Sequence, residues 1–185
     1  MRMIIISFDP VTDVGGVEGR ARSYLKHLVK FGHRVTLYDL SRPAKRKEIM
    51  VHEALVTFLS PSPWDIAITL GRILKDIFSN RPDTIFILSG TDTIVGIAIL
   101  IFARLLRIKS GVFLYGKDIL TARTHPIRLR MLRLGLLLAR RIGVNSIGTA
   151  NLLPDSARKK LSLLYPGVDP SITEGLESST SDSKT

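Results

Sequence analysis

Cysteine is absent from this chain of 185 residues, and that absence excludes several kinds of chemistry. Without cysteine there is no disulfide framework, no thiolate metal site and no thiol nucleophile. The four histidines are scattered and do not have the spacing of metal ligands: His27, His33, His52 and His125. We therefore expect no metal site in this protein.

Long hydrophobic runs are also lacking. The longest covers residues 94–103 between Asp92 and Arg104, and it is shorter than the roughly 20 residues of a membrane-spanning helix. The N-terminus carries one arginine before a short apolar run that ends at Asp9, which is not the pattern of a secretory signal. We expect a cytoplasmic protein, with peripheral attachment to the inner face of the membrane left open.

Acidic residues are scarce in one third of the chain. Residues 93–154 contain ten basic residues and a single acid, Asp118, within a chain whose formal net charge is +11. An anionic membrane surface and nucleic acid both suit such a segment. Base stacking needs aromatic side chains, however, and Tyr115 is the only phenylalanine, tyrosine or tryptophan in residues 114–164. We therefore expect no nucleic-acid partner.

What is present is a regular alternation of apolar runs and helical patterns, in a chain long enough for one domain. Candidate strands cover residues 3–8, 34–39, 54–59, 84–88, 111–115, 143–147 and 162–165. Helical patterns cover residues 19–31, 63–78, 93–106, 126–141 and 154–161. The strands are rich in Ile, Val, Leu and Phe without polar alternation, as in a parallel sheet covered on both faces. The prediction is a doubly wound, mostly parallel α/β domain of about seven strands.

The composition changes near the C-terminus. A turn-like segment at residues 166–170 is followed by residues 171–185, which are rich in Ser, Thr, Asp, Glu and Lys. Such a segment is typical of a linker or a disordered tail. We therefore expect a domain over residues 1–170 and a polar linker or tail over residues 171–185.

A glycine pair, Gly15 and Gly16, stands between the first strand and the first helix. This arrangement can bring backbone N–H groups at a helix N-terminus up to a phosphate, because no side chain intervenes. The same glycines would equally suit an ordinary strand–helix turn. The spacing matches neither the G-x-G-x-x-G fingerprint nor a P-loop.

In an open parallel sheet, ligands bind beyond the carboxyl ends of the strands. Small and polar residues follow the predicted strands at residues 9–19, 89–92, 115–118 and 148–149. Individually, Asp92 and Asp118 could be helix caps, Gly116 a turn residue and Lys117 a solvated surface residue. Because such residues recur where this topology places a crevice, we favour a ligand site for the set.

The helical pattern at residues 126–141 combines leucines with five arginines. Such a helix can lie in the headgroup layer of a membrane. A core helix with arginines at its solvent edge explains the leucines equally well, but not the near absence of acids. The residues expected at an anionic membrane are Arg128, Arg130, Arg133, Arg140 and Arg141.

Five motifs in order carry a resemblance to a known family. They are Gly15-Gly16 with its helix; residues 28–37, similar to L-x-x-x-G-H-x-V-T-V; residues 81–87, similar to P-D-V-I-H; residues 111–118, similar to P-V-V-x-T-x-H-G-x-D; and residues 165–169, similar to I-P-N-G-V-D. Together they resemble the N-terminal domain of family 4 glycosyltransferases, which have the GT-B fold of two facing Rossmann-like domains.

The resemblance implies a retaining transfer of a sugar from a nucleotide-sugar, which is a substrate rather than a cofactor. It places the backbone of Gly15 and Gly16 at the donor diphosphate. Asp92, Gly116, Lys117 and Asp118 would border the sugar and the acceptor. The catalytic side chain is unknown, with Tyr115 and Asp118 as candidates. The family has histidine where this chain has Tyr115, and a tyrosine cannot act as a base near neutral pH.

In this family a C-terminal domain holds most of the nucleotide-sugar, with two glutamates eight residues apart. The match ends before that domain, so we expect this polypeptide to be inactive without such a half, supplied in cis or in trans. The basic segment fits a lipid-linked or membrane-proximal acceptor. Two alternatives are a non-catalytic membrane-docking or scaffolding subunit of a split glycosyltransferase, and a stand-alone nucleotide-binding module.

Overall fold

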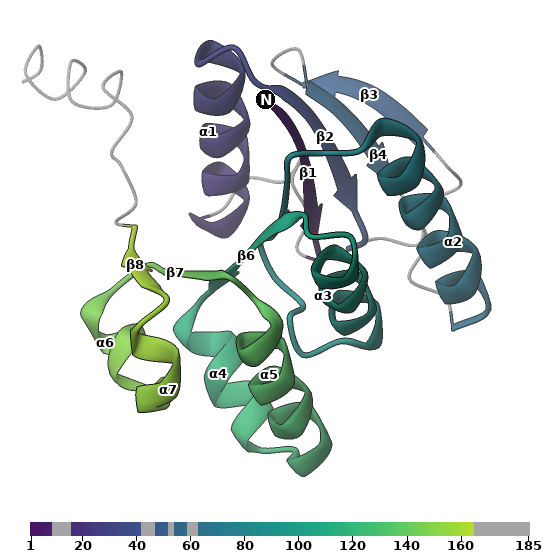
Figure 1. Ribbon diagram of the computed structural model, residues 1–185. Helices are drawn as coiled ribbons and strands as arrows, with labels where there is room; N and C mark the ends of the chain where they lie inside the picture. Colours follow the sequence, from purple (N-terminus) through teal and green to yellow (C-terminus); the bar gives the residue numbers. More distant parts are fainter. Residues whose placement is uncertain (9–15, 42–46, 52–53, 59–62, 165–185) are drawn as a thin grey trace, which may run out of the picture.

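The computed structural model describes residues 1–8, 16–41, 47–51, 54–58 and 63–164 (Figure 1). Its strands are β1 (Arg2–Ser7), β2 (Arg34–Asp39), β3 (Lys47–Val51), β4 (Ala54–Phe58), β5 (Thr84–Ile87), β6 (Lys109–Leu114), β7 (Arg141–Val144) and β8 (Leu161–Leu163). Its helices are α1 (Gly16–Lys30), α2 (Pro63–Asn80), α3 (Ile94–Leu105), α4 (Gly116–Arg123), α5 (Pro126–Leu138), α6 (Ile147–Asn151) and α7 (Asp155–Arg158).

All eight described strands form one sheet in the order β3-β4-β2-β1-β5-β6-β7-β8. Every neighbouring pair is parallel except β3 and β4, which are antiparallel. The predicted doubly wound, mostly parallel α/β fold is confirmed, and each of the seven predicted strands has a counterpart. The additional strand, β3, is an edge strand that begins Lys47-Glu48, and charged residues of this kind weaken the strand pattern in the sequence.

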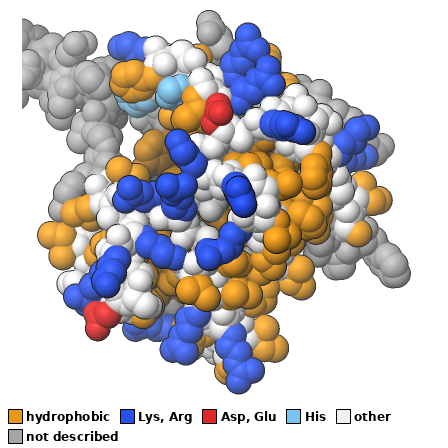
Figure 2. Space-filling view, in the orientation of Figure 1, with side chains coloured by type: hydrophobic (Ala, Val, Ile, Leu, Met, Phe, Trp, Pro, Cys, Tyr) orange, Lys and Arg blue, Asp and Glu red, His pale blue; other side chains and the backbone are white. Residues whose placement is uncertain are grey.

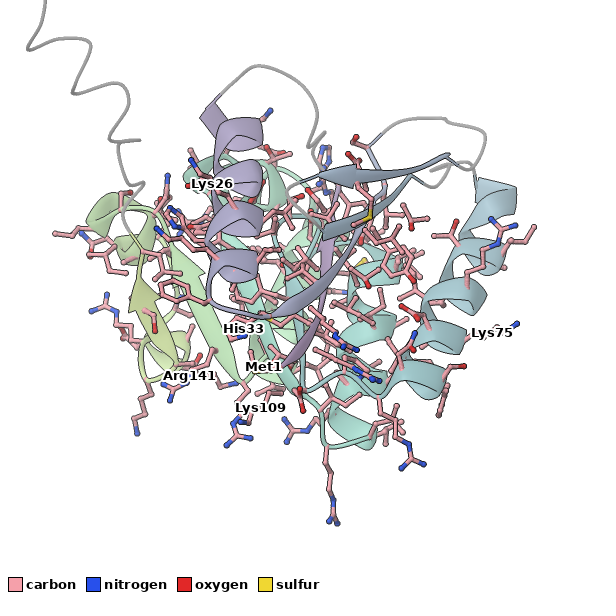
Figure 3. All side chains as sticks on the ribbon, turned by 90° about the horizontal axis from the view of Figure 1, so that it is seen from above. Met1, Lys26, His33, Lys75, Lys109 and Arg141 are labelled. Atoms are coloured by element: carbon pink, nitrogen blue, oxygen red, sulfur yellow. The ribbon has the colours of Figure 1, made fainter. Side chains whose placement is uncertain are left out.

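Helices cover both faces of the sheet, as Figure 3 shows from above with α1 on one side and α2 and α3 on the other. Side chains of β1 alternate between the two layers: Ile4 and Ile6 join the larger core cluster, whereas Ile5 joins the smaller one under α1. The larger cluster includes residues of α2, α3, α4 and α5. The apolar strand pattern arises because neither face is left to solvent.

Two glycines allow aromatic rings to lie across the sheet on the α1 face. A Cβ atom at Gly111 would lie 2.6 Å from the ring of Phe86, and one at Gly143 would lie 2.8 Å from the ring of Phe113. The Phe113 ring also meets the rings of Tyr24 and Tyr115 edge to face, at centroid distances of 5.9 and 5.0 Å. Tyr115, at the end of β6, is therefore part of this packed layer.

The short helices depart from the sequence predictions. No helix was predicted over residues 116–123 or 147–151, but α4 begins directly after Tyr115, and α6 begins at Ile147, which was expected to end a strand. The helical pattern predicted over residues 154–161 shrinks to α7, because Leu161 already belongs to the sheet. The helix predicted over residues 126–141 is shorter, because α5 ends at Leu138 and β7 already starts at Arg141. Among the described residues, no helix combines the length and the apolar character needed to cross a membrane.

The order of the strands reverses between β1 and β5, because the chain proceeds to β2 on one side and to β6 on the other. Figure 3 labels Met1, His33, Lys109 and Arg141 along the edge where the strands start. We call this the amino edge of the sheet. The opposite edge, where the parallel strands end, is the carboxyl edge, at which doubly wound folds bind ligands.

Candidate functional site at the carboxyl edge of the sheet

The carboxyl ends of β1, β5, β6 and β7 lie along one edge, since these strands are parallel neighbours. The segments that follow them therefore start at the same edge, as a shared binding site requires. Gly15, one of the two predicted phosphate-binding glycines, lies outside the described residues. Gly16 is the first residue of α1. The proposed phosphate role of this pair stays a prediction.

A hydrogen bond joins the segments after β1 and β5, at the point where the order of the strands reverses. The backbone N–H of Phe8 donates to Ser89 Oγ at 2.8 Å. Gly90 has a φ of +76°, and a Cβ atom there would lie 2.2 Å from the Phe8 ring. Only glycine fits this position, because the left-handed backbone and the close ring both exclude a side chain. The loop after β5 is thus held rigidly against β1.

Asp92, one of the predicted acceptor-site residues, is held by a residue of α5. Arg128 Nε donates to Asp92 Oδ2 at 2.6 Å, and the Asp92 side chain is only 6% exposed, against 45% for Arg128. The pair joins the loop after β5 to α5 across 36 positions of sequence. Arg128 was expected to contact a membrane, yet its guanidinium neutralises a buried carboxylate beside the candidate site.

The segment after β6 forms the start of α4. Asp118 accepts a hydrogen bond from the backbone N–H of Tyr115 at 3.0 Å, which is the back-bond of a capping box. Lys117 is exposed, and Gly116 is half-buried. Tyr115 is 7% exposed because its ring packs on Phe113. The structure thus gives Tyr115 and Asp118 clear packing and capping roles, and their candidacy as catalytic residues stays a prediction.

In the segment after β7, the predicted candidate Thr149 is joined by two polar residues that the sequence analysis missed, Asn145 and Ser146. Thr149 Oγ1 donates to Asn145 Oδ1 at 2.7 Å, and the backbone N–H of Thr149 donates to Ser146 Oγ at 3.0 Å. A Cβ atom on Gly116 would lie 3.4 Å from Thr149 Oγ1, so α4 and α6 begin side by side. The sequence signal for this cluster was a serine three residues before a threonine, at the end of a strand, which is a helix-capping pattern.

Together, the described part of this edge presents hydroxyl groups, backbone N–H groups at the start of α4, and one exposed ammonium group, Lys117. Its carboxylates, Asp92 and Asp118, already accept hydrogen bonds from Arg128 and from a backbone N–H. Such an arrangement suits the binding of hydroxyl and phosphate groups better than proton transfer. Within the described ranges, no cluster of His, Asp and Glu could hold a metal ion.

The five arginines predicted at a membrane do not form one group. Arg128 pairs with Asp92, whereas Arg130 and Arg133 are exposed on α5. Arg140 and Arg141 stand at the start of β7, on the opposite edge of the sheet, where Figure 3 labels Arg141 near Lys109.

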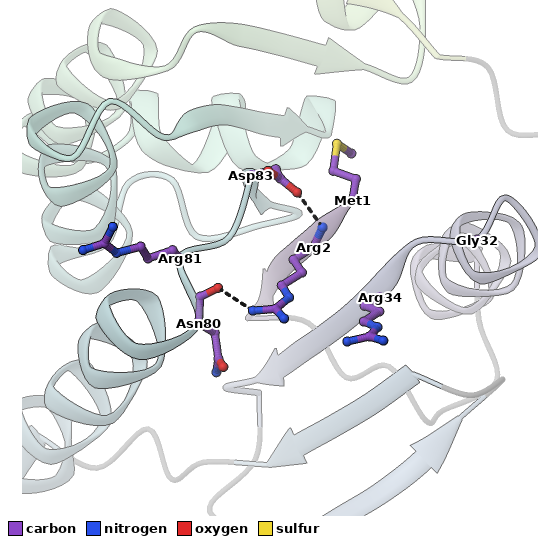
Figure 4. Close-up of a pocket in the computed structure, with 7 residues that line it drawn as sticks. All are labelled: Met1, Arg2, Gly32, Arg34, Asn80, Arg81 and Asp83. Atoms are coloured by element: carbon purple, nitrogen blue, oxygen red, sulfur yellow. Dashed lines mark hydrogen bonds between the residues drawn. The ribbon is translucent and has the colours of Figure 1, made fainter.

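Away from this edge, residues that the structure describes line two cavities. One, of about 420 Å³, lies at the amino edge and is lined by Met1, Arg2, Gly32, Arg34, Asn80, Arg81 and Asp83 (Figure 4). There the side chain of Arg2 donates from Nη1 to the backbone oxygen of Asn80, and the backbone N–H of Arg2 donates to Asp83 Oδ2. Figure 4 shows the Arg81 side chain pointing away from Arg2. The other cavity, of about 430 Å³, lies between α4, α5 and the end of α6, beside Ile119 and Leu132.

Comparison with known proteins identifies the family. The model of "Glycosyltransferase Family 4" matches residues 14–172. No curated protein matches the chain. Among solved structures, Anabaena Alr3699/HepE in complex with UDP is similar with a TM-score of 0.63 and 16% identity, over 98% of this chain and 50% of that one.

Two further structures of the same Anabaena protein are similar. The complex with UDP and glucose gives a TM-score of 0.60 at 15% identity, over 96% of this chain and 50% of that one. The complex with UDP-glucose gives a TM-score of 0.59 at 14% identity, over 100% of this chain and 51% of that one. The chain thus spans about half the length of these structures and shares the α/β fold of half of a GT-B glycosyltransferase. It belongs to glycosyltransferase family 4.

Proposed function

We propose that this protein is the N-terminal, acceptor-side domain of a retaining glycosyltransferase that takes its sugar from a nucleotide-sugar. The observation that carries the proposal is the family match, which extends over nearly the whole parallel sheet and both of its helical layers. A nucleotide-sugar donor is supported by the similar structures, which are complexes with UDP, with UDP and glucose, and with UDP-glucose. The acceptor is a lipid-linked or membrane-proximal molecule, in keeping with the basic surface of residues 93–154.

In this proposal the carboxyl edge meets both substrates. The backbone at Gly15 and Gly16 approaches the donor diphosphate at the start of α1. Asp92, Gly116, Lys117 and Asp118 border the sugar and the acceptor. Lys117 is exposed at the first turn of α4, so its ammonium group and the helix N-terminus attract the same anionic group. Arg128 holds Asp92 in position from α5.

Catalysis requires a second, donor-binding half, present in cis or in trans. This requirement follows from the size of the match, because the chain corresponds to about half of the similar structures. In a two-domain enzyme of this kind, each half contributes one wall of the substrate crevice. We therefore expect the chain by itself to bind UDP weakly or not at all and to transfer no sugar.

The test joins the chain to a family 4 C-terminal half, by fusion or co-expression, and measures transfer of labelled glucose from UDP-glucose to a detergent extract of membranes. Transfer is expected only with both halves present, and Lys117→Ala should reduce it about tenfold or more through weaker phosphate binding. Lys159→Ala, at an exposed position of α7's C-terminal end, is the matched control.

Two results would replace this proposal. Micromolar binding of UDP-glucose to the isolated chain, measured by calorimetry, would identify a stand-alone nucleotide-binding module. Association of the two halves without transfer to any extract component would instead favour a non-catalytic docking or scaffolding subunit.

A further inference from the structure

Helix α3 is apolar around its whole circumference. Its sequence, Ile94 to Leu105, contains one charged residue, Arg104. One side packs into the core through residues that include Val95, Ile99 and Ala103. The opposite side carries Ile94 and Leu105, which are 67% and 71% exposed, with Ile101 between them. A helix at the surface of a globular protein is ordinarily polar on its outer side, so this face lacks the expected solvent-adapted residues.

Helix α5 extends the same apolar surface. It packs beside α3, where a Cβ atom at Gly135 would lie 3.3 Å from Ile97 Cδ1. Its outer side exposes Ile127, Leu134 and Leu137, by 73%, 42% and 67%. We define the α3–α5 surface by these six exposed side chains of the two helices: Ile94, Ile101, Leu105, Ile127, Leu134 and Leu137.

Every charged residue of α3 and α5 is basic. Arg130 and Arg133 are exposed on α5, while Arg104 and Arg107 are exposed at the end of α3. Among the residues that the structure describes, none of these four arginines forms a salt bridge. Figure 2 shows hydrophobic side chains gathered near α2 and α3, with many Lys and Arg side chains around them and few acidic ones.

We propose that the α3–α5 surface docks on an anionic lipid bilayer. The aliphatic side chains enter the boundary between headgroups and acyl chains, and the four arginines bind lipid phosphates. Positive charge around an exposed aliphatic patch matches a surface that is itself anionic outside and apolar beneath. The inference rests on the proposed function, because it names the surface on which the membrane-proximal acceptor is met.

The position of the surface relative to the candidate site supports this assignment. Ile94 starts α3 two residues after Asp92, and Ile127 adjoins Arg128, which holds Asp92. Docking therefore brings the bilayer to the end of the carboxyl edge that carries the predicted acceptor residue. In this proposal Arg104 and Arg107 join Arg130 and Arg133 as lipid contacts. Arg128 is left out because it pairs with Asp92, and Arg140 and Arg141 are left out because they stand at the start of β7.

Sedimentation of the chain with vesicles tests the proposal without donor or second half. Binding is expected with vesicles of phosphatidylcholine and phosphatidylglycerol, little with phosphatidylcholine alone, and loss in high salt. Ile94→Ser with Leu105→Ser, and separately Arg130→Glu with Arg133→Glu, should each weaken binding about tenfold or more. Thermal unfolding checks that each variant is folded.

Matched controls place equal changes outside the surface. Phe31→Ser removes an exposed side chain just after α1, and Lys30→Glu with Arg34→Glu reverses two exposed charges beside it, at the end of α1 and the start of β2. Both should bind like the unchanged protein. Equal loss in these controls, or no sedimentation of the unchanged chain, would overturn the proposal. A dimer in solution that Ile94→Ser with Leu105→Ser dissociates, without vesicle binding, would assign the surface to a second copy.

These outcomes are independent of those for the proposed function. Sugar transfer in detergent does not need vesicle binding, and vesicle binding by the chain alone needs neither donor nor transfer. Failure of docking alongside successful transfer would remove only the membrane assignment.

Discussion

At the scale of single residues, the contact between α5 and the loop after β5 depends on the absence of a side chain. A Cβ atom at Gly135 would lie 2.6 Å from Thr91 Cγ2 and 2.9 Å from the backbone oxygen of Thr91. The backbone oxygen cannot move without shifting the loop that carries Asp92. Gly135 therefore sets how closely α5, with Arg128, approaches the candidate site.

We predict that Gly135→Ala destabilises the protein by about 1–3 kcal/mol, because the added methyl group overpacks this contact. Chemical denaturation monitored by circular dichroism would measure the change. Gly71→Ala in α2 is the matched control, since nothing lies within 4 Å of the added Cβ there. That variant should gain about 0.5–1 kcal/mol from higher helix propensity. Equal effects at the two sites would show that the contact with Thr91 is unimportant.

The role of Arg128 could not be read from the sequence, but its contact with Asp92 in the structure defines it. Arg128 belongs to a run of arginines whose spacing suggests a solvated or membrane-facing stripe. In the fold its Nε lies 2.6 Å from a carboxylate that is nearly excluded from water. Removing the guanidinium would leave that charge uncompensated, so the pair fixes the loop after β5.

At the scale of elements, Lys160 closes the C-terminal end of α5. Its Nζ donates to the backbone oxygens of Leu136, Leu137 and Ala139 at 3.1, 2.7 and 2.9 Å. These are carbonyl groups that a helix end leaves without intrahelical partners. Burial, and then repulsion from Arg104, lower the pKa of Lys160 below its ordinary value of 10.5. A single side chain just before β8 thus anchors α5, and with it half of the α3–α5 surface.

We predict that Lys160→Met lowers the free energy of unfolding by about 1–2 kcal/mol, because the aliphatic stem remains while the hydrogen bonds are lost. Urea denaturation would measure the loss. Lys159→Met, at the neighbouring exposed position, should leave stability nearly unchanged. A similar loss in both variants would mean that general charge, rather than the capping of α5, determines the effect.

At the scale of the whole molecule, the sheet has a protected centre and weaker margins. β1 and β5 are flanked by strands on both sides and by helices on both faces, whereas β3 and β8 are edge strands. β8 has only three residues, and Leu163 is partly exposed. Local opening therefore costs least at the margins.

We predict that amide hydrogens of β1 and β5 exchange slowest, near the limit of global unfolding, and that those of β3 and β8 exchange much faster. Hydrogen exchange followed by mass spectrometry would resolve the strands. Protection of β8 equal to that of β5 would contradict this order and would indicate that a further segment covers the β8 edge.

Local patterns in the sequence determined most of the framework. Runs of branched aliphatic residues identified all seven parallel strands. The pattern is strongest in the central strands, because a strand buried on both faces needs apolar residues at nearly every position. Local patterns also located the main helices, although Gly116 and Ile147 were placed outside helices that they in fact begin. Such short helices have too few residues for a periodic pattern, and only their caps mark them.

The tertiary structure alone decided which residues meet. Asp92 and Arg128, Lys160 and the end of α5, and Gly135 and Thr91 are pairs separated by more than twenty positions. It also decided that the outer side of α3 is exposed to solvent, although the apolar sequence of this helix is typical of a fully buried one. A local pattern records what each residue prefers as its surroundings, whereas the partner that supplies those surroundings depends on how the sheet orders its strands and how the helices pack upon it.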